Sequence, residues 1–138
     1  MPKIQLLNIQ RQDIVKGKVV WTMTSKANED LSRICQIIHQ TVDVEKIYLF
    51  GSYAYGTPNQ ESDYDLCVLI PDHSLRPADA VKRIRRALFP VQGTPLDVIV
   101  YRTEVFKQRQ AQPSLERKIA REGIILYEQQ GEMEQRMV

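Results

Sequence analysis

Two short apolar stretches, residues 44–50 and 64–70, most constrain the fold that this chain can adopt. Each has the length of a strand, and each stops at a strand-breaking residue, Gly51 in the first case and Pro71 in the second. The segment between them includes residues 56–60, which are rich in turn-forming residues. We therefore expect two core strands, with the chain leaving the first, making a brief excursion and returning beside it.

The remaining pattern predicts helices mixed with strands, and hence the fold class α/β (α+β). Apolar residues recur at three- and four-residue steps over residues 29–40, which predicts an amphipathic helix with Asn28 as its cap. Pro77 suits the first turn of a helix over residues 77–88, and a third strand is expected at residues 96–101. Shorter elements follow: helices at residues 103–108 and 114–121, and a strand at residues 124–127.

The length of the chain bounds its organisation. With 138 residues, 43% of them hydrophobic, we expect one domain over residues 1–138, with a core at about residues 28–128. Residues 1–25 form an extension that the pattern does not assign, and the polar tail at residues 129–138 has little to bury. Because there is no bilayer-length apolar run and no signal-peptide pattern, we expect a cytoplasmic location and no membrane association.

Composition argues against several site types. A net charge of +2 is too mild to indicate nucleic acid as the primary partner. Cys35 and Cys67 fall inside apolar runs, so we expect buried free thiols. His39 and His73 have no second histidine or cysteine at ligand spacing, so we expect both to be solvated and no zinc site.

Two aspartates, Asp63 and Asp65, stand two residues apart at the start of the second strand. Because side chains alternate across a strand, both carboxylates project from one face. Like charges this close oppose folding unless a cation offsets them, and Mg²⁺ prefers carboxylate oxygens and substrate phosphates. Asp97, near the start of the third strand, adds a third carboxylate. Three aspartates suit two Mg²⁺ ions about 3.5 to 4 Å apart, with Mn²⁺ as the alternative.

Ten residues separate Ser52 from Asp63 in the sequence. Gly51 has no side chain, so a phosphate can approach the backbone there, and Ser52 can present its hydroxyl and neighbouring amides to phosphate oxygens. The expected reaction is attack of a hydroxyl on the α-phosphorus of a nucleoside triphosphate, with pyrophosphate leaving. One ion would lie between Asp63, Asp65 and the triphosphate. A second would be shared with Asp97, which is also the candidate general base.

At these residues the chain resembles a known family. Residues 49–57 (LFGSYAYGT) and 62–66 (SDYDL) resemble the signature of the DNA polymerase β-like nucleotidyltransferase superfamily, in particular its minimal nucleotidyltransferase (MNT) branch. That signature is Gly-Ser, ten residues, and then Asp-x-Asp. The resemblance covers about residues 31–128, and residues 95–98 resemble the segment that carries the third carboxylate of the family.

The resemblance implies a mixed β-sheet flanked by helices, which is the polymerase β-like nucleotidyltransferase fold. Many members have arginine where Tyr55 stands, so a positive charge that could serve phosphate or acceptor is missing here. The roles implied at matching positions are triphosphate binding by Gly51 and Ser52, and metal binding by Asp63, Asp65 and Asp97.

The resemblance also implies a partner. Minimal members often occur beside a small helical ribonuclease toxin of the HEPN type, and some attach AMP to a tyrosine of that toxin. We therefore expect transfer of AMP from ATP to a hydroxyl of a partner protein, with the chain as the antitoxin. Because the length leaves little room for a substrate-binding domain, another chain or a homo-oligomer must supply the acceptor surface. The alternatives are a non-catalytic module that neutralises by contact, and a transferase acting on a small molecule or RNA.

Other charged and aromatic residues have simpler interpretations. Tyr53 and Tyr55 could pack a nucleobase, but tyrosine after a strand is more often structural. Glu61 and Asp72 border the aspartates in sequence, and we expect both to lie outside the site. The basic residues of the helix over residues 77–88 are expected to form its solvated face, with contact to an acidic partner or to the triphosphate as the alternative. These basic residues are Lys82, Arg83, Arg85 and Arg86.

Overall fold

The main sheet of the protein has four strands in the order β5-β4-β3-β6. They are β3 (Lys46–Phe50), β4 (Tyr64–Ile70), β5 (Leu96–Arg102) and β6 (Ile124–Glu128). Strand β3 pairs antiparallel with both β4 and β6, whereas β4 pairs parallel with β5, so the sheet is mixed as expected. The computed structural model describes residues 13–15, 18–20, 25–55, 63–91, 93 and 95–129.

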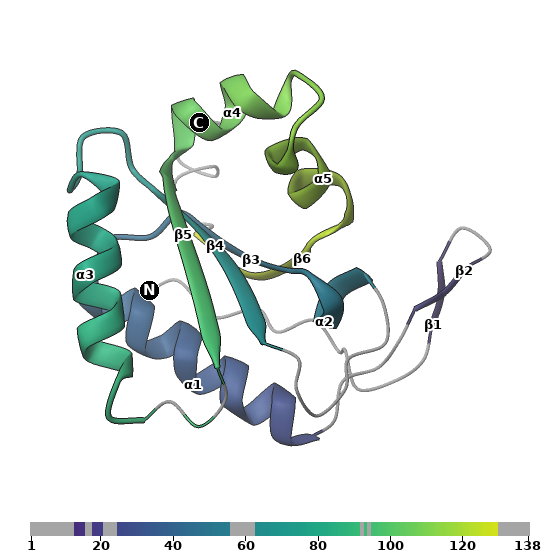
Figure 1. The fold of residues 1–138 in the computed structure, drawn as a ribbon, viewed down its shortest axis with the longest axis horizontal. Helices are drawn as coiled ribbons and strands as arrows, with labels where there is room; N and C mark the ends of the chain where they lie inside the picture. Colours follow the sequence, from purple (N-terminus) through teal and green to yellow (C-terminus); the bar gives the residue numbers. More distant parts are fainter. Residues whose placement is uncertain are drawn as a thin grey trace, which may run out of the picture.

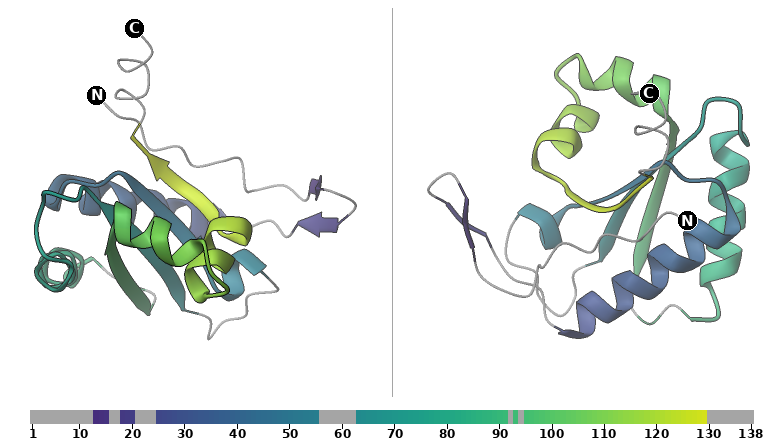
Figure 2. Two further views of the ribbon diagram at one scale, coloured as in Figure 1. Left: turned by 90° about the horizontal axis from the view of Figure 1, so that it is seen from above. Right: turned by 180° about the vertical axis from the view of Figure 1, so that it is seen from behind.

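Helices cover both faces of this sheet (Figures 1 and 2). The helices α1 (Ser25–Thr41) and α3 (Pro77–Leu88) pack on one face, and α4 (Thr103–Gln110) and α5 (Leu115–Glu122) pack on the other. A single helical turn, α2 (Ser52–Tyr55), follows β3 directly. Within the first 25 residues, β1 (Asp13–Val15) and β2 (Lys18–Val20) form a separate antiparallel pair.

The core consists of two apolar clusters, one on each face of the sheet. Leu66 and Val68 of β4 are fully buried in the cluster that includes α1 and α3. Cys67 and Leu69 alternate with them and join the cluster that contains Phe106 of α4. Strand β4 is therefore buried on both faces, which is why its sequence is almost uniformly apolar after its first two residues.

All eight helices and strands predicted beyond residue 25 are present; β4 and α3 have the predicted boundaries, and those of the other six are shifted. The cap prediction at Asn28 is wrong, because α1 begins at Ser25 and Asn28 lies inside the helix. The reason is that the apolar stripe starts one turn earlier than Leu31, at the buried Ala27. Strand β3 begins at Lys46, two residues later than predicted. Pro77 stands in the first turn of α3 as expected.

The thiol prediction is confirmed, and the histidine prediction is half confirmed. Cys35 and Cys67 are buried and free, and burial raises the pKa of the Cys35 thiol to about 12. His73 is exposed, but the prediction that His39 is solvated is wrong. Its Nδ1 lies 3.1 Å from the hydroxyl of Tyr127, and the two rings are 5.0 Å apart, because the last turns of α1 pack beside β6.

The basic residues of α3 are exposed, as predicted for a solvated helix face; they are Lys82, Arg83, Arg85 and Arg86. No helix in the part of the chain that the structure describes is long and apolar enough to cross a membrane. Glu61 and most of the polar tail lie outside the described residues, and so does the side chain of Tyr55. The assignment of residues 1–138 to one domain stays a prediction.

The contact of α4 with the sheet yields a stability test. Phe106 is 1% exposed, and its ring lies 5.7 Å from the rings of both Tyr48 and Tyr101. We expect Phe106→Ala to lower the free energy of unfolding by about 3–5 kcal/mol, because it leaves a cavity. The neighbouring Val105 is 38% exposed, so Val105→Ala should lower it by less than about 1 kcal/mol. Urea unfolding measures both, and equal losses would contradict this packing.

Candidate active site

The sheet brings two of the predicted carboxylates to adjacent positions. In the parallel register of β4 and β5, Asp65 is the direct partner of Asp97. Partners on neighbouring strands lie about 4.8 Å apart in the backbone and project from the same face. In Figure 1 the helix α4 lies at the ends of β4 and β5, whereas both strands begin at the opposite edge of the sheet. The two aspartates stand near these beginnings, away from α4.

Asp63 reaches the same edge because the start of β4 is tied to β5. It directly precedes β4, and the backbone N–H of Tyr64 donates a hydrogen bond to the carbonyl of Pro95 at 3.0 Å. Tyr64 is 2% exposed and belongs to the apolar cluster with α1 and α3. The predicted alternation is confirmed here, since Tyr64 enters the core from one face while Asp65 lies on the other.

Burial and two other carboxylates act on the charge of Asp65. Burial raises the pKa of the Asp65 carboxyl, and the negative charges of Asp97 and then Asp63 raise it further. Asp63 and Asp65 are half-buried, whereas Asp97 is exposed. The ionised form of Asp65 is thus destabilised by the two groups that the sequence predicts as its companions.

Gly51 is required by the close approach of the Asp65 carboxylate. The register of β3 and β4 pairs Phe50 with Asp65, which places the next residue, Gly51, beside that side chain. Gly51 has φ of +79°, and a Cβ built on it would lie 2.1 Å from Oδ2 of Asp65. Both the left-handed backbone and the missing side chain are therefore needed at this position.

Ser52 begins the turn α2 and is exposed. The turn is closed by a hydrogen bond from the N–H of Ala54 to the carbonyl of Gly51 at 3.0 Å. The ring of Tyr53 packs against that of Tyr64 with 4.7 Å between centroids. The structural interpretation of Tyr53 is therefore confirmed, and its packing holds the turn that carries Ser52.

The donor set fits a divalent ion in chemistry, but it is not a preassembled metal site. Across the described ranges, no three side chains among histidine, cysteine, aspartate and glutamate are grouped so that they could hold a metal ion. The structure thus forms the Asp65 and Asp97 pair that was expected, but no ready-made three-carboxylate cluster. The charge repulsion at Asp65 nonetheless suits a hard cation, because carboxylate oxygens are its preferred ligands and its charge offsets the repulsion.

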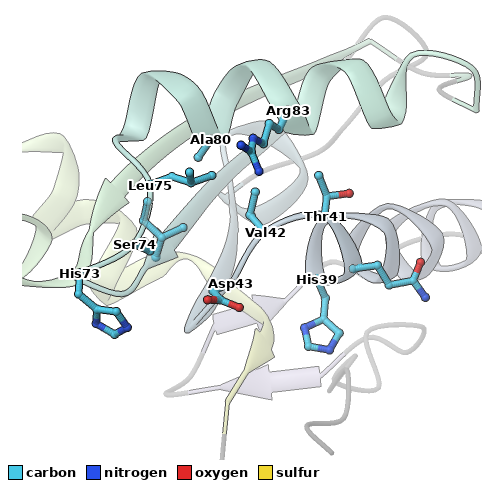
Figure 3. Close-up of a pocket in the computed structure, with 11 residues that line it drawn as sticks. His39, Thr41, Val42, Asp43, His73, Ser74, Leu75, Ala80 and Arg83 are labelled. Atoms are coloured by element: carbon cyan, nitrogen blue, oxygen red, sulfur yellow. The ribbon is translucent and has the colours of Figure 1, made fainter.

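A hollow among the described residues lies away from the carboxylates. It has a volume of about 530 Å³ and is bordered by Ile70, the last residue of β4, at the end of that strand opposite Asp65. His39, Asp43 and Arg83 also line it, and Arg83 reaches toward it from α3 (Figure 3). None of the predicted site residues borders this hollow. The carboxylate edge therefore remains the candidate active site.

The fold agrees with the comparisons to known proteins. The family model described as Polymerase beta, Nucleotidyltransferase matches residues 32–132. The chain therefore belongs to this family of nucleotidyltransferases, whose members generally use a divalent metal ion. A comparison with curated proteins found no match.

Among solved structures, the chain is similar to components of toxin–antitoxin complexes. A chain in the crystal structure of a mutant MntA–HpeT toxin–antitoxin complex is 22% identical, with 76% of this chain and 78% of that chain covered and a TM-score of 0.53. A chain in the structure of a tri-AMPylated Shewanella oneidensis HEPN toxin with an MNT antitoxin is 20% identical, with coverages of 78% and 76% and a TM-score of 0.45. The first likeness shows a shared fold.

The contact between Gly51 and Asp65 can be tested by adding one methyl group. Gly51→Ala places a Cβ in the left-handed region and against the carboxylate, so we expect a loss of at least about 1–2 kcal/mol in the free energy of unfolding. The matched control is Gly93→Ala, where a Cβ meets nothing within 4 Å, and the change should stay within about 0.5 kcal/mol. Equal denaturation midpoints for the two variants would contradict the close approach.

The raised pKa of Asp65 makes the stability of the metal-free protein depend on pH. Because folding raises this pKa, the folded state binds the proton more tightly, and stability falls as the pH rises through the folded pKa. We expect Asp65→Asn to raise the Tm in EDTA at pH 7 by a few degrees, with the advantage shrinking as the pH is lowered. The exposed Asp43 supplies the control, since Asp43→Asn should leave the Tm within about 1 °C. A lower Tm for Asp65→Asn at pH 7 would contradict the repulsion.

Proposed function

We propose that this chain is a metal-dependent nucleotidyltransferase that transfers AMP from ATP to a hydroxyl group of a partner protein. The observation that carries the proposal is the direct pairing of Asp65 with Asp97 beside Gly51. Membership of the nucleotidyltransferase family supports the reaction class. Within that reaction class, we propose AMP as the transferred group and a protein as the acceptor.

The nucleotide is held by the three aspartates, through a metal ion, and by the Gly51–Ser52 segment. Asp63, Asp65 and Asp97 would hold Mg²⁺ or Mn²⁺, which when bound supplies positive charge that neutralises the phosphates. Gly51 admits the Asp65 carboxylate into the space that a Cβ would fill, so this metal-holding side chain lies beside the backbone at which we propose that the phosphate binds. The hydroxyl of Ser52, at the exposed start of α2, donates a hydrogen bond to a phosphate oxygen.

The transfer is an in-line displacement at the α-phosphorus. The acceptor hydroxyl oxygen forms a bond to this phosphorus while the bond to the bridging oxygen of pyrophosphate breaks, and pyrophosphate leaves. The proton of the acceptor hydroxyl passes to the carboxylate of Asp97. Asp97 is the exposed member of the three, so a hydroxyl on a large partner can reach it, whereas the half-buried Asp65 lies further inside.

The biological role that we propose is that of an antitoxin. The structure that shares the fold with a TM-score of 0.53 comes from a toxin–antitoxin complex. The signature at residues 49–57 and 62–66 resembles the MNT branch, whose partners are HEPN toxins. We propose that the acceptor hydroxyl belongs to a partner of this kind, and that the two proteins meet in the cytoplasm.

Transfer can be measured directly by incubating the chain with ATP, Mg²⁺ and the protein encoded next to it, followed by mass spectrometry. We expect an adenylyl group on the partner. Asp97→Asn should lower the transfer rate by about 10²–10³-fold, in the range of a lost general base. The control is Asp72→Asn, because Asp72 is exposed and caps α4 by accepting from the N–H of Glu104 at 2.9 Å. Full neutralisation of a toxic partner by Asp97→Asn would instead indicate inhibition by contact.

A further inference from the structure

We propose that Asp30 of α1 is a positioning residue for the active site and that it acts through Tyr64. This inference rests on the proposed function and extends it to a residue on the opposite side of the sheet from the carboxylates. The hydroxyl of Tyr64 donates a hydrogen bond to Oδ2 of Asp30 at 3.1 Å. The two residues are 34 positions apart in the sequence, so their contact arises only in the fold.

Tyr64 connects every backbone segment that carries a predicted site residue. Along the chain it lies between Asp63 and Asp65. Its backbone N–H binds the carbonyl of Pro95 at 3.0 Å, which ties the start of β4 to the start of β5 and hence to Asp97. Its ring packs against Tyr53 at 4.7 Å, next to Ser52. One buried residue, Tyr64, therefore contacts all three segments.

The bond to Asp30 adds something that burial alone does not supply. A phenylalanine would fill the same space in the apolar cluster, but it would lose the hydrogen bond from the hydroxyl to Asp30. The carboxylate of Asp30 fixes the ring, because α1 is anchored in the core by neighbours such as the fully buried Leu31. A rigid Tyr64 limits the movement of the backbone on either side of it. Small displacements of reacting groups can lower a rate by as much as about 10²-fold.

The experiment compares Tyr64→Phe with Tyr127→Phe in the adenylyl-transfer assay. Tyr127 is also fully buried, and its hydroxyl lies 3.1 Å from Nδ1 of His39 at a distance from the carboxylates, so it controls for the loss of a buried hydroxyl. We expect Tyr64→Phe to lower kcat about tenfold with KM for ATP changed by less than about twofold, because only the transition-state geometry suffers. Tyr127→Phe should lower the Tm but leave kcat unchanged.

Variants of Asp30 complete the test. Asp30→Ala should lower kcat as much as Tyr64→Phe does, and the double variant should lose no more than either single one, since both remove the same bond. Asp30→Asn should restore most of the rate, because the amide oxygen still accepts the hydrogen bond. An active wild-type chain whose kcat is unchanged in Tyr64→Phe and Asp30→Ala would overturn this inference alone. A wild-type chain that transfers no nucleotide to its partner would overturn the proposed function and this inference with it.

Discussion

The repulsion between Asp65 and Asp97 is the interaction on which the rest of this structure depends. Parallel pairing of β4 with β5 makes the two residues direct partners, and the pKa of Asp65 is raised first by burial and then by the charge of Asp97. A fold without a use for this arrangement would be more stable with a neutral side chain at either position. Because Gly51 has no Cβ, the Asp65 carboxylate can lie against its backbone.

Apolar burial holds the charged edge together. The clusters on the two faces of the sheet bury β4 almost completely, and their hydrophobic contribution offsets the local repulsion. The buried face of β4 at its start is occupied by Tyr64, whose hydroxyl binds Asp30. The carboxylates thus lie on the exposed side of a strand whose other side is fixed in the core.

Much of this fold could be predicted because its signals are local. The strand that ends at Gly51 and the alternation of Asp63, Tyr64 and Asp65 follow from apolar runs, breakers and the two-residue period of a strand. The Gly-Ser pair and the two aspartates of the Asp-x-Asp pattern could be recognised from their spacing in the sequence. The apolar run at residues 44–50 correctly predicted a core strand, although the strand begins at Lys46.

What could not be predicted depends on contacts between distant segments. Nothing in the sequence near Asp30 indicates that it meets Tyr64, and nothing near His39 indicates that it meets Tyr127. The misplaced cap at Asn28 has the same origin, because the start of α1 depends on packing of Ala27 rather than on capping. Hydrophobic periodicity describes which residues are buried, but it does not describe which polar groups they meet.

The most direct test of the central claim is a crystal structure of the chain grown with Mn²⁺ and a non-hydrolysable ATP analogue, with anomalous scattering used to locate the metal. The account predicts anomalous peaks in contact with the carboxylates of Asp63, Asp65 and Asp97, with the triphosphate beside Gly51 and Ser52. An ordered nucleotide and metal bound elsewhere, for example in the hollow beside Arg83, would contradict it.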